Sequence, residues 1–408
     1  MKLTDDDRGI LSGESGPGAQ KAMEILLSLG RIFEAEKMIP IESAQIAGVS
    51  YLNIGDIGLE FLKDWADAGA RVSIPSFMNP AGIDRRLWKK MGISDHFARQ
   101  QMEIISTLHR MGIEETLTCT PYHIGHVPKN GDHLAWSESS AVSFANSALG
   151  ARTNREGGPS ALAAAIIGKT PFYGLHLFEN RVATHRINVK CTVKTVEEYN
   201  LLGHTIGSKV GHAIPYIHGL ELLIDSPHAT SCLKSLGAAM AASGSIALYH
   251  IDGITPEAIE YGPDLSGDHM SEITITHLDE SRHALQQSST KLQLVTLGCP
   301  HASLDELKNY AHLLQDVRVK IPLWITTSAH VYQQAEENGL LDIIERSGAL
   351  VIADTCMVVA PLKYLGYSYI AVDSAKAACY LPSHQDATTY FGSTEQCIKS
   401  AREGKWIS

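Results

Sequence analysis

The last third of the chain repeats one unit, in which a short apolar strand is followed by a helix. We expect strands at 292–297, 323–327 and 349–353, with helices from about 303 and at 331–338. Continuous apolar strands are typical of parallel sheets that are buried on both faces. Because parallel strands need a crossover connection, this repeat predicts an α/β fold.

The first part of the chain also alternates helical and strand-like patterns. Apolar residues recur at helical spacing over 18–33, 57–68 and 95–111. A short strand is expected at 70–75, where Pro75 would end it. The same alternation therefore extends the α/β prediction toward the N-terminus.

The composition limits the class of protein. Of 408 residues, 44% are hydrophobic and 19% are charged, which predicts a sizeable buried core rather than a disordered chain. The formal net charge of -11 argues against a general nucleic-acid binder, which usually has a basic face. An anionic substrate stays compatible with this charge, because a few cations focused in a cleft outweigh the global balance.

Neither a targeting signal nor a membrane anchor is expected. The segment 1–8 has no apolar run, and the longest apolar stretches, such as 161–167, are too short to span a bilayer. Seven cysteines, an odd and widely spaced set, argue against a disulfide framework. A reducing, cytoplasmic location fits these features best.

Three of the seven cysteines follow strand-like segments. Cys119 comes after 115–118, and Cys299 and Cys356 each come after an apolar strand of the repeat. Side chains just beyond the carboxyl ends of parallel strands form the active sites of α/β folds. The other four, Cys191, Cys232, Cys379 and Cys397, lack this setting and are interpreted as ordinary buried thiols.

Three converging thiolates fit two kinds of metal. Zinc would need a fourth ligand, such as His123 or His301, and would indicate a lyase or hydrolase. A four-iron cluster held by three cysteines would leave one iron open as a Lewis acid. The spacing alone leaves a further alternative, in which the cysteines are only core residues of a non-catalytic scaffold.

The residues around these cysteines resemble the aconitase X family. The resemblance covers almost the whole chain, and the segments that carry it are 48–51, 79–82, 119–122, 136–140, 150–156, 297–303, 354–356 and 373–376. The pattern departs from ordinary aconitase, where two ligands share one CxxC, since each cysteine here comes from its own loop.

The resemblance implies an aconitase-like, multi-lobed α/β architecture with parallel-sheet units around a central iron–sulfur site. It makes Cys119, Cys299 and Cys356 the ligands of a cluster, expected to be [4Fe-4S] with one open iron. We divide the chain into α/β lobes at 1–285, with Cys119 and much of the substrate pocket, and a lobe at 286–408 with the other two cysteines.

The implied activity is that of a hydro-lyase. The open iron would hold the substrate hydroxyl, and a base would take a proton from the adjacent carbon. In the aconitase superfamily this base is a serine on a small swivelling domain, which bacterial fused members carry in the same chain. The resemblance places the large part in these 408 residues, so we expect a separate small subunit in a heterodimer.

Two substrates occur in the family. Archaeal two-subunit members act on mevalonate 5-phosphate, giving an anhydromevalonate phosphate for isoprenoid synthesis by a mevalonate pathway, and bacterial members act on cis-3-hydroxy-L-proline. The segments 45–51 and 79–82 are more similar to the archaeal type. Mevalonate 5-phosphate is therefore the expected substrate, and cis-3-hydroxy-L-proline is the alternative.

Two small-residue segments are candidate substrate contacts. The backbone N–H groups of Gly48 and Val49 and the hydroxyl of Ser50 are suited to bind a carboxylate or a phosphate, although a simple turn would have the same sequence. Asn79, followed by Pro80, offers an amide to the substrate, or the pair simply ends the preceding strand.

Charged residues supply the remaining candidates. Glu138 and Ser139 are expected near the cluster, with helix capping as the alternative. Lys376 lies among small residues and is suited to pair with a substrate carboxylate, with snorkelling to the surface as the alternative. His301 is a candidate donor near a cluster sulfur. The polar run 152–156 is compatible with anion binding or with a structural network.

Overall fold

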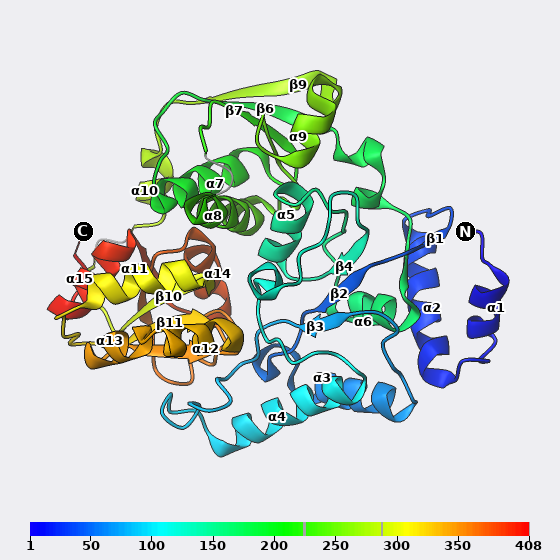
Figure 1. Cartoon of the computed structure of the whole chain (residues 1–408), viewed down its shortest axis with the longest axis horizontal. Helices are drawn as coiled ribbons and strands as arrows, with labels where there is room; N and C mark the ends of the chain where they lie inside the picture. The colour runs from blue at the N-terminus through cyan, green and yellow to red at the C-terminus, as the bar shows by residue number, and fades with distance from the viewer. Residues whose placement is uncertain (223–225, 287–288, 408) are drawn as a thin grey trace.

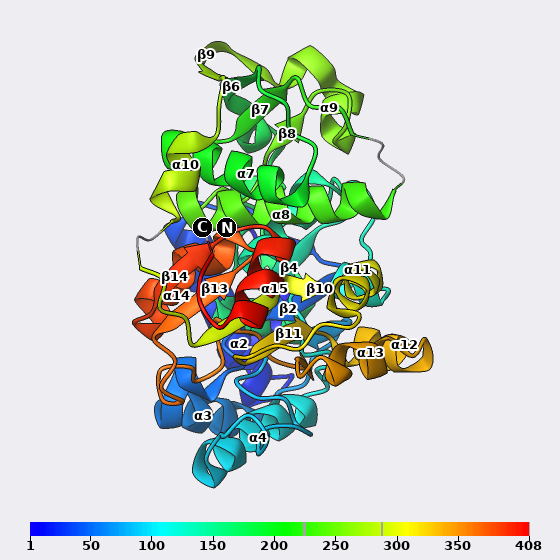
Figure 2. The same cartoon turned by 90° about the vertical axis from the view of Figure 1, so that its left-hand side faces the viewer.

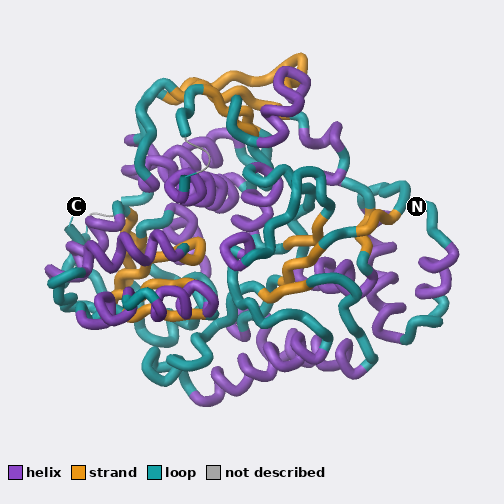
Figure 3. Tube along the Cα trace, viewed as in Figure 1, coloured by secondary structure: helices purple, strands orange, loops and turns teal. Residues whose placement is uncertain are grey.

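The computed structural model describes residues 1–222, 226–286 and 289–407, and its elements form three groups along the chain (Figure 1). The first group lies at the right and bottom of Figure 1, the second at the top and the third at the left. Figure 2 shows from another side that the second group lies above the third. In the third group helices flank the strands, whereas in the second group the strands lie at the outer edge of the molecule with helices beneath them (Figure 3).

The first group contains a parallel three-stranded sheet of order β3-β2-β4 and an antiparallel pair, β1-β5. Its strands are β1 (Met38–Pro40), β2 (Ser43–Ile46), β3 (Ser76–Met78), β4 (Leu134–Trp136) and β5 (Lys169–Pro171). Its helices are α1 (Asp5–Leu11), α2 (Pro17–Ile32), α3 (Tyr51–Asp67), α4 (Asp95–Arg110), α5 (Ser139–Ser147) and α6 (Gly158–Ile167), with a 3-10 turn η1 (Pro121–Ile124).

Two of the strand predictions in this group, at 70–75 and 115–118, are wrong. Residues 70–75 bond to helix ends and loops, with Val72 N–H donating to Met111 O at 2.9 Å, and the strand begins only after Pro75. β3 is an edge strand, next to which a proline without an N–H is tolerated. The strand expected at 115–118 is interrupted by Leu117, whose φ of 45° lies in the left-handed region.

The second group is a parallel four-stranded sheet of order β8-β7-β6-β9 with α7 and α8 packed together beside it. Its elements are β6 (Ala183–Val189), α7 (Val196–Val210), β7 (Pro215–His218), α8 (Pro227–Gly244), β8 (His250–Ile251), α9 (Pro256–Tyr261), β9 (Ser266–Ile275) and α10 (Asp279–Ala284). The two helices approach closely at glycines: a Cβ on Gly203 would stand 2.5 Å from Leu236 O. Glycine at this position therefore allows the close packing of α7 and α8.

The third group is a parallel five-stranded sheet of order β12-β11-β10-β13-β14. Its elements are β10 (Leu294–Ala302), α11 (Leu304–Leu314), β11 (Leu323–Thr327), α12 (Ala329–Glu337), α13 (Leu340–Arg346), β12 (Leu350–Ala353), β13 (Tyr369–Val372), α14 (Ala375–Gln385), β14 (Thr388–Phe391) and α15 (Thr394–Glu403). The predicted strand–helix repeat and the α/β fold class are confirmed.

Two cores cover the two faces of this sheet. Val295, Leu297 and Ile325 face one core, together with side chains of α11, α12, α13 and α15. Leu294 and Trp324 face the other core, which α14 and residues of the first two groups complete. This alternation is the period of a strand, and burial on both faces explains why the strands are apolar throughout. The second core joins the groups to one another.

In the part of the chain that the structure describes, no helix is both long enough and apolar enough to cross a membrane.

Arg181 joins the first two groups from a fully buried position. Its guanidinium donates two hydrogen bonds to the carboxylate of Glu257, at 2.6 and 2.9 Å. Further hydrogen bonds reach the carbonyl oxygens of Asn146, Ala151 and Leu175, at 3.0–3.1 Å. A buried arginine with all these partners orients the groups, because each partner would otherwise be an unsatisfied buried polar group.

Replacement of Arg181 by Met is expected to lower the free energy of unfolding by about 3–5 kcal/mol, since Glu257 is left buried without a cation. Urea denaturation followed by circular dichroism measures the change. The control is Arg110→Met, which breaks an exposed pair with Asp67 and should cost about 1 kcal/mol or less. Equal losses in the two variants would contradict the structural role of Arg181.

Candidate metal and substrate site

Three cysteines line one cavity of about 80 Å³ between the first and third groups. The space exceeds what one ordered water needs, roughly 10–15 Å³ on this measure. The residues that line the cavity are Asn79, Pro80, Cys119, Glu138, Cys299, Cys356, Val358, Val359, Lys376 and Tyr380. The structure therefore brings together seven of the residues that the sequence analysis selected.

Each cysteine reaches the cavity from a different segment of the chain. Cys119 lies two residues before η1, Cys356 follows β12, and Cys299 lies in a bulge near the end of β10. In this bulge residues 298–301 stand opposite Thr326 alone, because the ladder passes from Leu297↔Ile325 to Ala302↔Thr327. Bulges redirect side chains next to active sites.

The cavity lies where the order of the five-stranded sheet reverses. The chain runs from β10 outward through β11 and β12, then returns to β13 and β14 on the other side of β10. Open α/β sheets bind ligands outside the carboxyl ends of their strands at this switch point. Cys299, at the end of β10, and Lys376, just after β13, lie there.

His301 connects the loops of all three cysteines. Its backbone N–H donates to Cys119 Sγ at 3.2 Å, and its ring contacts Thr118 Oγ1 at 3.0 Å and Thr355 O at 2.9 Å. A carbonyl oxygen only accepts, so Nε2 carries the proton and Nδ1 accepts from Thr118. Burial lowers the pKa of His301 to about 4, which keeps the ring neutral.

The loop before Cys356 is bound to the first group. Arg85 Nε donates to Asp354 Oδ2 at 2.8 Å, and Arg85 also pairs with Glu115. Ala81 N–H donates to Asp354 O at 2.8 Å. Asp354 has a φ of 65°, in the left-handed region, so these contacts hold the backbone in a conformation that turns it toward the cavity.

Burial disfavours the ionised form of the three cysteine thiols. Burial raises the pKa of Cys119, Cys299 and Cys356 to about 12 each. Each thiol also lies near enough to another for their charges to interact. Thiolates in this pocket need a bound cation, and thiols that ionise on binding metal are a known coupling of metal affinity to protonation.

The donor set fits a cluster better than one zinc ion. Among the described residues, no three His, Cys, Asp or Glu side chains are grouped closely enough to hold a single ion. Both ring nitrogens of His301 have protein partners, and His123 does not line the cavity. Three thiols around a shared space, with no histidine among the described residues that line it, fit a cluster with one open iron.

Glu138 and Lys376 form a buried ion pair in the cavity wall. Lys376 Nζ contacts Glu138 Oε1 and donates to Ser140 Oγ at 3.0 Å. Burial alone would raise the pKa of Glu138, but Lys376 and the hydrogen bonds from Ser140 and Ala141 outweigh it and hold that pKa below its usual value. Glu138 also caps α5, which was the alternative interpretation, and its contact with a substrate stays a prediction.

Asn79 has a buried amide oxygen without a hydrogen-bond partner. Its side chain lines the cavity, and its backbone N–H donates to Ile46 O at 3.0 Å. An unpaired buried acceptor costs roughly 1–3 kcal/mol unless a ligand satisfies it. Asn79 is therefore poised for a donor such as a hydroxyl, and its role in substrate binding stays a prediction.

Gly48, Val49 and Ser50 lie behind the cavity and do not line it. The hydroxyl of Ser50 donates to Val359 O at 2.8 Å and accepts from Leu52 N–H at 3.2 Å as the cap of α3. Ser139 does not line the cavity, but its hydroxyl lies 3.3 Å from Oε1 of Glu138, which does. Substrate contact by these four residues stays a prediction.

Sequence analysis missed three residues that line the cavity: Val358, Val359 and Tyr380. The valines follow Cys356 in a loop and had no distinguishing pattern. Tyr380 lies one helical turn after Lys376 on α14, and side chains four residues apart share a helix face. That spacing was a usable signal for Tyr380.

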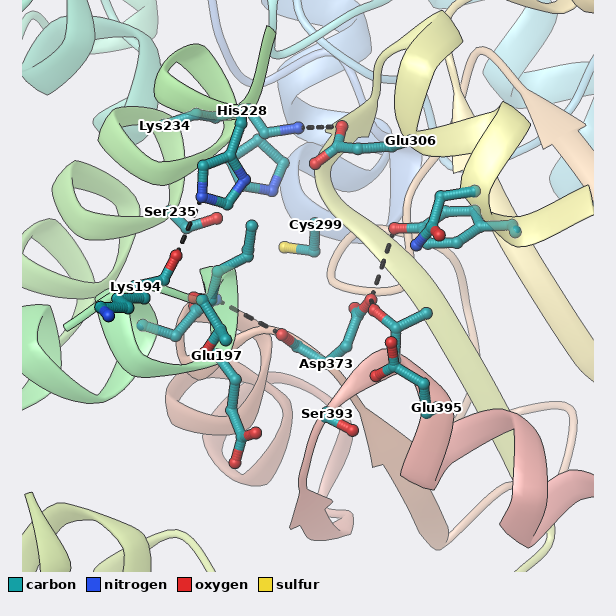
Figure 4. A pocket seen from close by; sticks show the side chains of 17 residues that line it. Lys194, Glu197, His228, Lys234, Ser235, Cys299, Glu306, Asp373, Ser393 and Glu395 are labelled. Carbon is teal, nitrogen blue, oxygen red and sulfur yellow. Dashed lines mark hydrogen bonds and ion pairs between the residues drawn. The ribbon is translucent and has the colours of Figure 1, made fainter. Parts of the chain in front are cut away.

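Cys299 also lines a second, larger cavity of about 420 Å³ between α7, α8, α11 and α15. Figure 4 shows Cys299 there beside the ion pair of Lys234 and Glu306, whose Nζ and Oε2 are 2.5 Å apart. Lys234 Nζ also donates to His301 O at 3.2 Å, so α8 contacts the backbone next to Cys299. The remaining cysteines, Cys191, Cys232, Cys379 and Cys397, line neither cavity, and all seven are free thiols.

Family models match three parts of the chain. The first, second and third domains of aconitase X match residues 1–179, 183–283 and 292–403. These ranges follow the three groups of elements in Figure 1.

Known relatives cover nearly the full length. The phosphomevalonate dehydratase large subunit of Methanothermobacter thermautotrophicus is 51% identical over 372 residues, 91% of each chain. The cis-3-hydroxy-L-proline dehydratase of Hypocrea jecorina is 32% identical over 416 residues, 99% of this chain and 69% of that protein. The crystal structure of Thermococcus kodakaraensis aconitase X in its holo-form has a TM-score of 0.90 and 49% identity, covering 98% of this chain and 100% of that one.

Replacement of Lys376 by Met is expected to destabilise the metal-free chain by about 3–5 kcal/mol, because Glu138 is then buried without a cation. Adding Glu138→Gln should recover part of this loss, since the uncompensated charge is removed. Urea denaturation of the wild type, both single variants and the double variant gives the coupling. Strictly additive losses would contradict the ion pair.

Proposed function

The chain belongs to the aconitase X family, and on that basis we propose that it is the large subunit of a hydro-lyase acting on mevalonate 5-phosphate. The product is trans-anhydromevalonate 5-phosphate, an intermediate of an archaeal-type mevalonate pathway. The observation that carries the proposal is the cavity at the switch point of the sheet, which three thiols and the Lys376–Glu138 pair line together.

The choice of substrate rests on the relatives. The phosphomevalonate dehydratase large subunit matches at 51% identity, whereas the cis-3-hydroxy-L-proline dehydratase matches at 32%. The higher identity to the phosphomevalonate dehydratase favours mevalonate 5-phosphate as the substrate. Cis-3-hydroxy-L-proline is the more distant alternative.

Cys119, Cys299 and Cys356 are proposed to hold a [4Fe-4S] cluster. The holo-form of the related crystal structure and the three-thiol donor set support this assignment. When bound, such a cluster supplies one open iron, a Lewis acid that binds a hydroxyl leaving group and a carboxylate.

The residues of the chain itself bind and orient the substrate. Lys376 presents its ammonium to the substrate carboxylate, while Glu138 and Ser140 hold that ammonium in place. The positive charge of Lys376 draws electron density from the carboxylate and so makes the neighbouring C–H bond more acidic. This C–H bond is the one that breaks. The unpaired oxygen of Asn79 accepts a hydrogen bond from the substrate hydroxyl. Gly48, Val49 and Ser50 support the wall behind Val359.

A separate small subunit is proposed to complete the site. The phosphomevalonate dehydratase relatives are named large subunits, and the match with this chain covers 69% of the longer cis-3-hydroxy-L-proline dehydratase. The base, a serine, is assigned to that subunit, where it takes the proton from the carbon next to the carboxylate. The hydroxyl leaves from the neighbouring carbon, so that one water is released for each double bond formed.

The proposal is tested by anaerobic co-purification with the small subunit and an assay of mevalonate 5-phosphate against cis-3-hydroxy-L-proline. We expect about four irons per heterodimer. We also expect turnover of mevalonate 5-phosphate but not of cis-3-hydroxy-L-proline. Turnover of cis-3-hydroxy-L-proline alone would contradict the proposed substrate. Zinc in place of iron would contradict the proposed cofactor.

The same assay, carried out on cysteine variants, distinguishes cysteines that bind the cluster from cysteines that are only part of the core. Replacement of Cys119, Cys299 or Cys356 by Ser should abolish turnover and lower the iron content. Cys191→Ser is the control, since Cys191 is a half-buried thiol outside both cavities. Full iron content in any of the three variants would contradict its assignment as a ligand.

A further inference from the structure

Tyr380 links the cysteine cavity to the surface. Its ring lines the cavity beside Lys376, and its hydroxyl accepts a hydrogen bond from Arg155 Nη2 at 3.3 Å. Arg155 is exposed, and Tyr380 is only half-buried, so this pair marks the mouth of the cavity. Among the described residues, Arg155 has no carboxylate partner, and its charge is available to a ligand.

The cavity lining offers one cation to the substrate. Among the described residues that line it, Lys376 is the sole cation, and its ammonium is paired with Glu138. A substrate with both a carboxylate and a phosphate therefore brings more negative charge than the interior neutralises. An uncompensated buried anion is costly, so the second anionic group requires a cation nearer the surface.

The shape of the substrate determines which group lies outside. In mevalonate 5-phosphate the carboxylate and the hydroxyl are on neighbouring parts of the molecule, and the phosphate is at the other end. Dehydration needs the first two at the thiols and Lys376, so the phosphate extends toward Tyr380 and the mouth.

We propose that Arg155, positioned by the hydroxyl of Tyr380, binds the phosphate of the substrate at the mouth of the cavity. This inference rests on the proposed function and adds a contact for the phosphate of the substrate. Arginine suits the task because its planar fork donates two parallel hydrogen bonds to a phosphate. Tyr380 is a positioning residue, since it accepts from one arm of the fork and leaves the other N–H groups free.

Hydrogen bonds continue from the mouth to the interior. Tyr380 OH lies 3.5 Å from Ser139 Oγ, which in turn donates to Glu138 Oε1 at 3.3 Å, next to Lys376. The phosphate-binding arginine and the carboxylate-binding lysine are therefore held by one polar chain. This gives Ser139 a supporting role rather than a direct contact.

The test compares Arg155→Gln, Arg155→Lys and Tyr380→Phe in the holoenzyme with its small subunit. For mevalonate 5-phosphate, Arg155→Gln should raise KM about tenfold or more, as expected for a lost hydrogen bond to a charged group, with a smaller change in kcat. Arg155→Lys should recover part of the loss, and Tyr380→Phe should have a weaker effect than Arg155→Gln. The inhibition constant of mevalonate, which lacks the phosphate, should stay unchanged in all three variants.

The control is Arg99→Gln on α4, an exposed arginine outside the cysteine cavity, which should leave KM unchanged. An unchanged KM in Arg155→Gln, or an equal weakening of mevalonate, would overturn the phosphate assignment. Loss of the small subunit from Arg155→Gln on size-exclusion chromatography would overturn it too, because Arg155 would then be an interface residue. Absence of turnover in the wild type would instead count against the proposed function.

Discussion

The hydrogen bonds of His301 hold the three cysteine loops in register. The residue lies two positions after Cys299, donates its backbone N–H to Cys119 Sγ, and donates its ring Nε2–H to Thr355 O, one position before Cys356. A shift of any one loop would break a hydrogen bond of a fully buried group, at a cost of roughly 1–3 kcal/mol. Loops from two different groups of elements are thus tied to one buried, neutral imidazole.

Buried ion pairs surround this junction and join the groups. Lys234 of α8 pairs with Glu306 of α11, and Lys376 of α14 pairs with Glu138 at the start of α5. Burying such pairs carries a desolvation cost, so their contribution lies in orientation more than in net stability. A consequence for function is that Lys376, the one cation among the described residues of the cavity lining, serves the substrate carboxylate, which leaves the charge of the phosphate to be met at Arg155 at the mouth.

Local patterns predicted the parts of the fold that depend on local physics. The strands near 294, 323 and 350 followed from apolar runs, since burial on both faces needs nothing further. The strands expected at 70–75 and 115–118 failed because tertiary hydrogen bonds and one left-handed residue decide those backbones. The site was only partly predictable: strand ends indicated Cys299 and Cys356, but no pattern reveals that Glu138, far away in sequence, neutralises Lys376.

The central claim is that the three cysteines hold a cluster whose open iron receives the substrate. Mössbauer spectroscopy of the anaerobic heterodimer, enriched in iron-57, tests it with and without mevalonate 5-phosphate. The account predicts that about a quarter of the iron signal, one site in four, changes when substrate is added, while the rest stays constant. A spectrum that is unchanged by substrate in a sample that turns over would contradict it.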